Sequence, residues 1–364
     1  MRTSERVSNI AARARNIFSF GLAIILLLGS GLSAWGQGAT ASSSASGDWK
    51  QVEAAMGRPG QMQAGGVIRF GMPRKDLHIV LDGVEIKPGL ALGSWAAFKR
   101  DNSGALVMGD LVLTEDEVEP VMMKLQEGGI QQSALHNHLI RESPHVMYLH
   151  IAGHGDAVEM AKAIHDAVAL TKTPGPEPAP ATPPTTELGI DQKPVEQALG
   201  HAGKVNGGVL QIGVPRAEPI TDSGMTVPFS MGVGTAINFQ PTGNGKAAIA
   251  GDFVLLGSEV NPVIKTLRQN GIQVTAIHSH MLMEEPRLFF MHFGRMTMRS
   301  NWLADSARHS TTPIQQNESA KQLDRTGFAE RAPHRVLWVF SEARNCGFWW
   351  AHRARRVHAA RSRR

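Results

Sequence analysis

Histidines at fixed spacing are the residues of this chain best suited to chemistry. A His-x-His pair on a strand points both imidazoles to one face, because strand side chains alternate. A third histidine on the next strand of the same hairpin would join that pair. The same three positions occur twice, 142 residues apart: His136, His138 and His150, then His278, His280 and His292. Clustered imidazoles suit zinc, copper, nickel, iron or manganese. The spacing therefore predicts transition-metal ligands, in one shared site or two.

Carboxylates accompany each set of histidines. Glu142 and Glu284 fall in the predicted turn of each hairpin. Either could act as a fourth ligand or as the general base of a metal-dependent hydrolase. Asp110 and Asp252 each follow a glycine on a predicted strand. We expect them to orient a metal-bound histidine from behind.

Arg74 and Arg216 each follow a proline at matching positions. A guanidinium in a loop can clamp a carboxylate or a phosphate, so both arginines are candidate ligand-binding residues. The sequence thus leaves three functions open. The histidines could bind a transition metal or a small anionic ligand, could serve a metal-dependent hydrolase, or could be packing residues of a structural envelope module. The pattern does not decide whether the protein is an enzyme, and the small ligand is unknown.

The elements that must position these residues also occur twice. Within the first copy we expect strands at 66–71, 77–86, 95–99, 106–113, 131–139 and 145–152. Thr114 and Glu117 form a capping-box pattern that predicts a helix ending near Gly128, and Asp156 begins a second amphipathic helix. The order favours an α+β fold: two tandem repeats of a β-hairpin plus a split βαβ, ferredoxin-like unit.

The duplication sets the domain boundaries. We expect the first repeat at 49–171, a proline-rich linker at 172–188 and the second repeat at 189–293. Residues 294–364 read as a basic tail without a helical stripe, where the second repeat should have its closing helix. Permitted codons for 295–315, read one frame over, give an amphipathic helix pattern. The hypothesis is that a frameshift replaced this helix with a disordered tail.

The first 36 residues have the layout of a secretory signal peptide. Four arginines precede an apolar run from Ile17 to Leu32, and small residues follow. We expect an exported protein, periplasmic, envelope-associated or secreted, with no membrane span once the signal is cleaved. Cys346 is the single cysteine, so no internal disulfide can form.

The charge distribution argues against nucleic acid as a partner. The chain carries a net charge of +5, but its basic excess lies in the two terminal segments. Residues 37–294 hold 19 Lys and Arg against 26 Asp and Glu. The predicted folded part is therefore acidic, which disfavours binding to a polyanion.

Two long passages carry a family resemblance. They are MGDLVLTEDEVEPVMMKLQEGGIQQSALHNHLIRESPHVMYLHIAGHGD and AGDFVLLGSEVNPVIKTLRQNGIQVTAIHSHMLMEEPRLFFMHF. Both resemble the LppY/LpqO lipoprotein family, a bacterial envelope family with a domain of unknown function that is commonly present in two copies. The resemblance implies an exported protein, and it supplies no activity and no catalytic residues. No cysteine stands directly after the apolar run, so the lipid-accepting residue of a lipoprotein is missing at that place.

Overall fold

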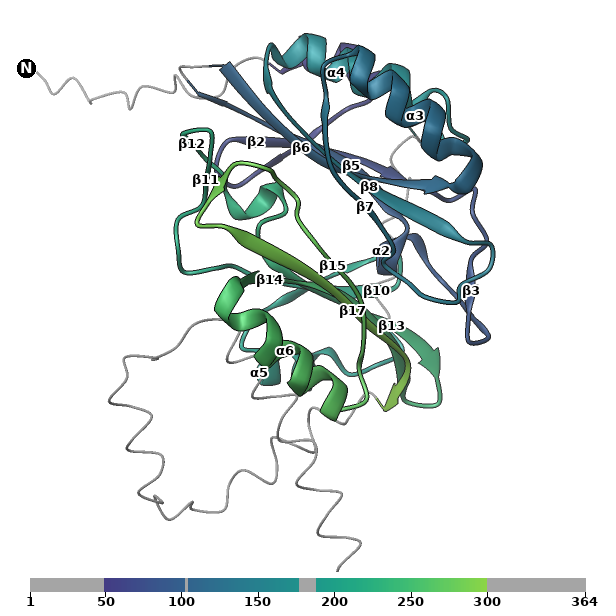
Figure 1. Cartoon of the computed structure of the whole chain (residues 1–364). Coiled ribbons are helices and arrows are strands. Elements are labelled where there is room, and N and C mark those ends of the chain that lie inside the picture. Colours follow the sequence, from purple (N-terminus) through teal and green to yellow (C-terminus); the bar gives the residue numbers. More distant parts are fainter. Residues whose placement is uncertain (1–48, 102–103, 177–187, 300–364) are drawn as a thin grey trace, which may run out of the picture. The chain divides into compact units, whose positions relative to one another are not determined.

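Each repeat builds one six-stranded antiparallel sheet (Figure 1). A computed structural model describes residues 49–101, 104–176 and 188–299. The expected signal peptide, most of the linker and the tail beyond 299 lie outside these residues. Both repeats belong to one compact unit. Among the described residues, no helix is both long and apolar enough to cross a membrane.

The first sheet has the strand order β1-β2-β5-β6-β8-β7. Its strands are β1 (Gln61–Gln63), β2 (Val67–Pro73), β5 (Gly93–Asp101), β6 (Gly104–Thr114), β7 (Gln131–His136) and β8 (Val146–Gly155). The expected strand at 77–86 is instead two short strands, β3 (Val80–Leu81) and β4 (Val84–Glu85), because Asp82 and Gly83 turn the chain with positive φ. The helices of this repeat are α1 (Lys50–Met56), α2 (Pro88–Ala91), α3 (Glu115–Glu127) and α4 (Ala157–Val168).

The second sheet repeats this order as β9-β10-β13-β14-β17-β15. Its strands are β9 (Gly203–Asn206), β10 (Val209–Val214), β13 (Thr235–Gly243), β14 (Lys246–Leu256), β15 (Gln273–His278) and β17 (Leu288–Arg299). Helices α5 (Gln192–Leu199) and α6 (Gly257–Gln269) correspond to α1 and α3. Along the chain, β10 is followed by β11 (Thr221–Asp222), β12 (Met225–Thr226) and the short helix η1 (Phe229–Met231) before β13 begins. A further short strand, β16 (Glu284–Glu285), pairs with β11.

A split βαβ connection is present in each repeat. β6 and β7 both run antiparallel to β8, which lies between them, and α3 joins β6 to β7. The chain then enters α4 instead of a further strand, and β5 occupies the other side of β6. The α+β class and the duplication are confirmed, whereas a ferredoxin-like unit is not.

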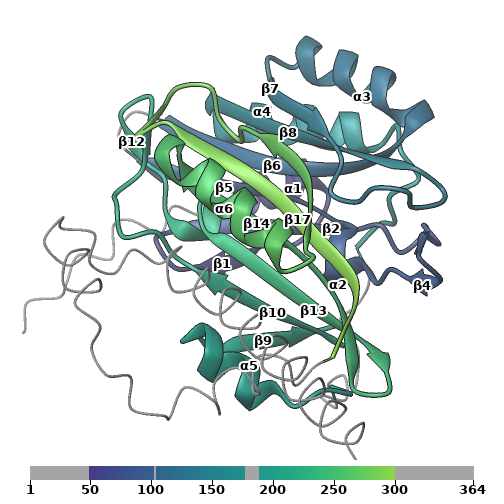
Figure 2. The same ribbon diagram turned by 60° about the horizontal axis from the view of Figure 1, so that its bottom comes forward.

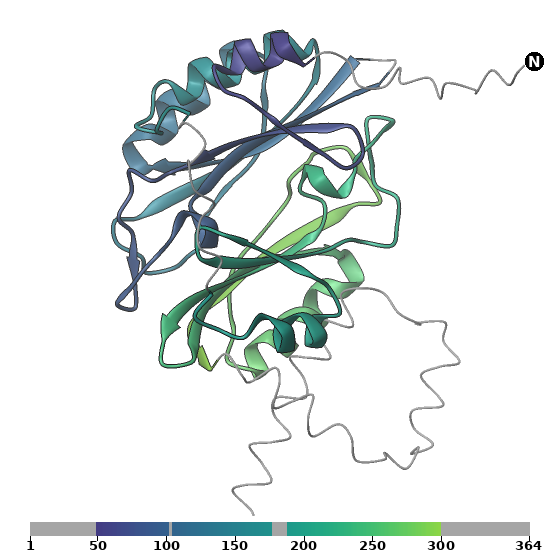
Figure 3. The same cartoon turned by 180° about the vertical axis from the view of Figure 1, so that it is seen from behind.

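Helices cover the outer face of each sheet. Figure 3 shows α1 beside α4, and their apolar faces share one core with the first sheet, which includes Val52, Phe98 and Ile164. Figure 2 shows α6 lying along the second sheet, where Val263 and Leu267 pack against Phe253. The expected cap of α3 is present in part, since the Thr114 N–H donates to Glu117 Oε2 at 2.9 Å.

The inner faces of the two sheets pack against each other. One buried cluster joins Leu106 and Met108 of the first repeat to Val254 and Phe290 of the second. Edge strands β7 and β15 also exchange equivalent bonds: Ser133 Oγ donates to the His280 carbonyl at 2.7 Å, and Thr275 Oγ1 donates to the His138 carbonyl at 2.9 Å. Side chains at the middle of this interface are therefore shielded by both repeats.

The second repeat extends beyond its expected end at 293. β17 continues to Arg299, where it pairs with Lys246 at the start of β14. Residues 294–299 are thus part of the sheet and do not belong to a disordered tail. The expected loss of the closing helix concerns residues beyond 299, outside the described part of the chain.

Candidate metal centre

Strand register places one aspartate and the third histidine of each repeat side by side. Asp110 of β6 is opposite His150 of β8, and Asp252 of β14 is opposite His292 of β17. On the other side of His150 and His292, the edge strand β7 or β15 contributes an alanine, Ala134 or Ala276. A small side chain there leaves room for the His-x-His pair of the same strand.

The His-x-His pair begins at the end of each edge strand. His136 is opposite Tyr148, two residues from His150, so His136 and His150 are diagonal neighbours. Their ring centroids are 4.9 Å apart. His138 follows beyond the strand and stacks on Tyr148, with centroids 3.5 Å apart. The second repeat matches this arrangement, since His280 stacks on Phe290 at 3.5 Å.

All six histidines meet in one cluster between the repeats. Three ring pairs cross the interface: His136 with His278 at 3.8 Å, His138 with His292 at 3.7 Å, and His150 with His280 at 3.8 Å between centroids. The last two pairs are equivalent under the 142-residue repeat, so their near-equal distances reflect an approximate twofold relation between the sheets. The six histidines therefore form one cluster shared by the two repeats, and not two separate clusters.

Backbone carbonyls orient several of these rings. His292 Nδ1 lies 3.3 Å from the Gly251 carbonyl oxygen, and His280 Nδ1 lies 3.2 Å from that of Gly232. His150 interacts in the same way with Gly109. A ring that donates from Nδ1 keeps its lone pair on Nε2, the atom that would bind a metal. The Nε2 atoms of His150 and His292 are buried and have no hydrogen-bond partner among the described residues.

His136 and His278 are the least satisfied of the six. Both nitrogens of each ring are buried without a hydrogen-bond partner in the described part of the chain. Leaving a buried polar atom unpaired costs about 1–3 kcal/mol. Such a concentration of unpaired atoms at one place calls for a ligand that can satisfy several of them at once.

The two aspartates lie at the edge of the cluster. Asp110 Oδ2 is 3.3 Å from His138 Nε2 and 4.0 Å from His150 Nε2, and Asp252 Oδ2 is 3.2 Å from His280 Nε2. The second oxygen of each carboxylate is buried without a partner among the residues described. Each aspartate could therefore orient a histidine, as expected, or bind a metal itself.

Three overlapping groups have ligand atoms within 4.8 Å of one another. They are His136, His138, His150 and His292; His150, His278 and His280; and Asp252, His278 and His292. Every group that contains only histidines takes ligands from both repeats. An ion held by either of these two groups would join the two sheets, whereas the group with Asp252 lies within the second repeat.

Burial keeps five of the imidazoles neutral. It lowers the pKa of His136 to about 2 and that of His280 to about 3. It also holds the pKa values of His150, His278 and His292 well below the usual range, with neighbouring histidines adding to the effect. Neutral imidazole is the form that binds metals, so the rings need not lose a proton first.

The aspartates respond to the same burial in opposite directions. Burial raises the pKa of Asp252 to about 8. Burial also opposes ionisation of Asp110, but His150 and His138 outweigh it and lower the pKa of that carboxyl below its ordinary value. The electrostatic environment of the cluster is therefore not symmetric, although its geometry nearly is.

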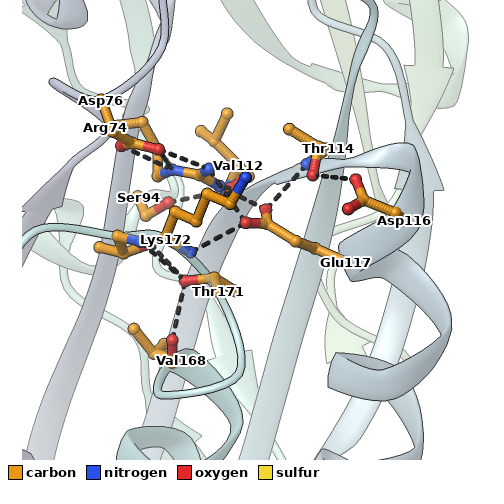
Figure 4. A network of polar contacts seen from close by, with 11 residues as sticks. Arg74, Asp76, Ser94, Val112, Thr114, Asp116, Glu117, Val168, Thr171 and Lys172 are labelled. Carbon is orange, nitrogen blue, oxygen red and sulfur yellow. Dashed lines mark hydrogen bonds and ion pairs between the residues drawn. The ribbon is translucent and has the colours of Figure 1, made fainter.

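Arg74 and Arg216 do not have the ligand-binding role expected for them. Arg74 is fully buried, and it pairs with Glu117 at 2.6 Å and Asp76 at 2.8 Å while donating to the Val112 carbonyl at 2.7 Å (Figure 4). Arg216 pairs with Glu259 at 2.9 Å in the same way. The donors of both guanidinium groups are used inside the fold, where they hold the first turn of α3 or α6 against the sheet.

Glu142 and Glu284 are also placed differently from expectation. Glu284 Oε1 accepts from the Leu288 N–H at 3.0 Å, and Glu142 Oε1 lies 3.5 Å from the Val146 N–H and from His145 Nε2. Both close the turn before β8 or β17. Neither belongs to a group of possible metal ligands among the described residues. Their position gives no support to a general-base role.

A cavity of about 340 Å³ opens beside the cluster. His138, His150, His280, His292 and both aspartates line it. Its lining also contains Arg69 and Trp95, which sequence reasoning did not single out. The strand pattern could have indicated both residues, because Arg69 and Trp95 lie on the two strands that precede the strand of Asp110. Their contacts with the second repeat, such as that of Arg69 with Ser230, could not be known from the sequence.

The fold and site define a duplicated α+β protein with one histidine cluster shared by its two sheets. The family model described as Domain of Unknown Function (DUF1259) matches residues 50–170 and 193–311. These matches span more than half of the chain and follow the duplication, so the chain belongs to this family. The more specific LppY/LpqO assignment is not confirmed. No curated protein and no solved structure gives a significant match.

Proposed function

We propose that this protein binds a transition-metal ion in the histidine cluster between its two repeats. The observation that carries the proposal is the convergence of six imidazoles whose buried nitrogens are largely unpaired. Water could satisfy one or two of these atoms, but an ion accepts lone pairs from three or four at once. The ion would therefore remove most of the cost of burying them.

The donor set limits the choice of metal. Imidazole nitrogens with a carboxylate oxygen suit zinc, copper, nickel, iron or manganese, and they do not suit calcium or magnesium, which prefer oxygen ligands. His150, His278 and His292 each belong to two of the overlapping groups. Because one Nε2 atom serves one ion, this sharing favours one or two ions per chain.

Two other functions were open. The stacking of His138 on Tyr148 and of His280 on Phe290 gives these two rings a packing role as well. It leaves the unpaired nitrogens of His136 and His278 unexplained. A metal-dependent hydrolase would need a base at the ion. Glu142 and Glu284, the bases expected for this role, belong to none of the candidate ligand groups among the described residues, so binding is the better-supported function.

Metal content by mass spectrometry tests the proposal. The full-length protein, purified without a histidine tag, should contain or take up about one or two ions per chain. A His136→Ala/His138→Ala/His150→Ala variant should lose this metal. The control is His78→Ala/His201→Ala, which removes two histidines outside every candidate ligand group. A folded protein that takes up none of the five metals, or equal uptake by variant and control, would refute metal binding.

We also propose that the protein is exported. The supporting observation is the signal-peptide layout of residues 1–36. N-terminal sequencing of the protein recovered from cells should begin after this segment, and fractionation should find it outside the cytoplasm. An intact Met1 in the cytoplasmic fraction would contradict export without affecting the metal proposal.

A further inference from the structure

Part of the wall of the cavity beside the histidine cluster is cationic. Arg69 of β2 and Trp95 of β5 form this wall, where Trp95 is the strand neighbour of Asp110, and four histidines and Asp252 also line the cavity. Arg69 Cζ lies 3.7 Å from the centroid of the Trp95 ring. Its Nη1 donates to the Ser230 carbonyl at 3.1 Å. Both contacts fix the plane of the guanidinium.

Arg69 keeps donors available for a ligand. A guanidinium has five N–H groups, and the Ser230 bond is the one hydrogen bond of this side chain found among the described residues. Burial lowers the pKa of Arg69 to about 10, while Asp110 opposes this change, so the group is still charged at neutral pH. A charged, oriented and mostly unpaired guanidinium is a typical binding group for carboxylate or phosphate oxygens.

The second repeat does not duplicate this wall. Trp95 is opposite both Gly71 and Asp110, and Ala236 takes its place opposite Gly213 and Asp252. The residue 142 positions after Arg69 is Gln211. Its side-chain amide is engaged, because it donates to the Gly89 carbonyl at 2.8 Å. The approximate symmetry of the cluster is therefore broken at the cavity, and a ligand would meet one cation in one orientation.

A route from outside reaches this wall. A wider groove of about 810 Å³ shares Arg69, Pro88, Gly89, Gly93, Trp95 and Gln211 with the inner cavity. Lys75 and Lys87 line the groove, with Glu85 as the one acidic residue in its lining. This excess of cations would favour the entry of an anion.

We propose that the cavity binds a small molecule with a carboxylate or phosphate group, held between Arg69 and an ion of the histidine cluster. The inference rests on the proposed metal binding. A divalent ion and one guanidinium outweigh the charges of Asp110 and Asp252, so the loaded site favours an anion even when both carboxylates are ionised. The volume of about 340 Å³ lies at the lower end of small-molecule sites.

Cobalt provides a test that distinguishes metal binding from anion binding. The full-length protein is loaded with Co²⁺, and its visible absorption bands are followed while acetate or inorganic phosphate is added. We expect a saturable shift with at least one of these anions, and the stronger of the two identifies the ligand class. Arg69→Gln introduces the residue found at position 211. It should keep the cobalt and bind the anion about tenfold more weakly or worse.

The matched control is Arg100→Gln, because the Arg100 guanidinium also lies over a tryptophan, 4.4 Å from the Trp49 ring centroid, and does not line the cavity. Its anion affinity should equal that of the wild type. Cobalt uptake with no response to either anion, or an unchanged affinity in Arg69→Gln, would overturn the anion site and leave metal binding intact. A folded protein that takes up neither cobalt nor any of the five metals named above would overturn both proposals.

Discussion

His136 and His278 come from different repeats, and their ring centroids lie 3.8 Å apart in the middle of the interface. Each ring has two buried nitrogens without a partner in the described structure. The 142-residue repeat relates the two positions. Their contact joins the two copies of the histidine motif in a single cluster.

Replacing either of these histidines should weaken metal binding. His136→Ala removes a ligand from one candidate group, and His278→Ala removes a ligand from two. We expect a loss beyond the roughly 10–100-fold that follows removal of an outer partner. Competition titration with a chromophoric chelator measures it. If one variant lost the metal and the other bound normally, the site would belong to a single repeat, contrary to the shared cluster.

The aspartates should support the metal without being indispensable. Asp110→Asn and Asp252→Asn remove the carboxylates that face His138 and His280. We expect each to lower metal affinity by roughly 10–100-fold. The same competition titration applies, with Asp82→Asn as the control because Asp82 lies outside the cluster on an exposed turn. Affinities equal to that of the control would remove the aspartates from the site.

The metal-free protein should lose stability on acidification. Five cluster histidines have lowered pKa values in the folded state. Below about pH 6.5 the histidines of the unfolded chain take up protons, whereas the same rings in the folded protein do not. The free energy of unfolding therefore decreases as the pH is lowered. Each such group contributes about 1.4 kcal/mol per pH unit. Asp252, with its pKa raised to about 8, acts in the opposite direction but is one group against five.

Urea denaturation between pH 7 and pH 4 measures this dependence. The metal-free wild type should show a midpoint that falls steeply below about pH 6.5. His136→Ala/His278→Ala, which removes two of the buried rings, should show a shallower fall. Equal pH dependence in the wild type and the double variant would mean that these two rings are protonated in the folded protein.

The buried arginine of each repeat should be a stability residue. Arg74→Met leaves Glu117 buried without its main partner, which we expect to cost about 3–5 kcal/mol. Lys124→Met, which breaks the exposed pair of Lys124 with Glu127, should cost about 1 kcal/mol or less. Chemical denaturation compares the two. An Arg74→Met protein as stable as the wild type would contradict the structural role and reopen ligand binding at this position.

Much of the fold could be predicted from the sequence because the elements are local. The 142-residue offset defines both repeats, and the Thr114–Glu117 pair marks the start of α3. The hairpin spacing places His150 near His136 and His292 near His278, and the ring centroids of these pairs lie 4.9 Å and 4.8 Å apart. These signals depend on residues near one another in the chain.

The joining of the two repeats could not be predicted in this way. Nothing in the spacing indicates that His138 packs against His292, because that contact depends on how the two sheets face each other. The arginines were misread for a related reason. A Pro-Arg pair resembles an exposed turn, and the burial of Arg74 becomes evident only when Glu117 of α3 lies next to it. Trp95 lacks its counterpart because a shift in register places Ala236 there.

Anomalous X-ray diffraction from crystals of the metal-loaded protein tests the central claim most directly. Data collected at the absorption edge of the bound metal should show a peak between the two sheets, within about 2.0–2.3 Å of histidine nitrogens from both repeats. A protein with metal bound elsewhere, or with ligands from a single repeat, would contradict a shared metal centre. A metal-soaked crystal with no peak among the six histidines would assign them to packing.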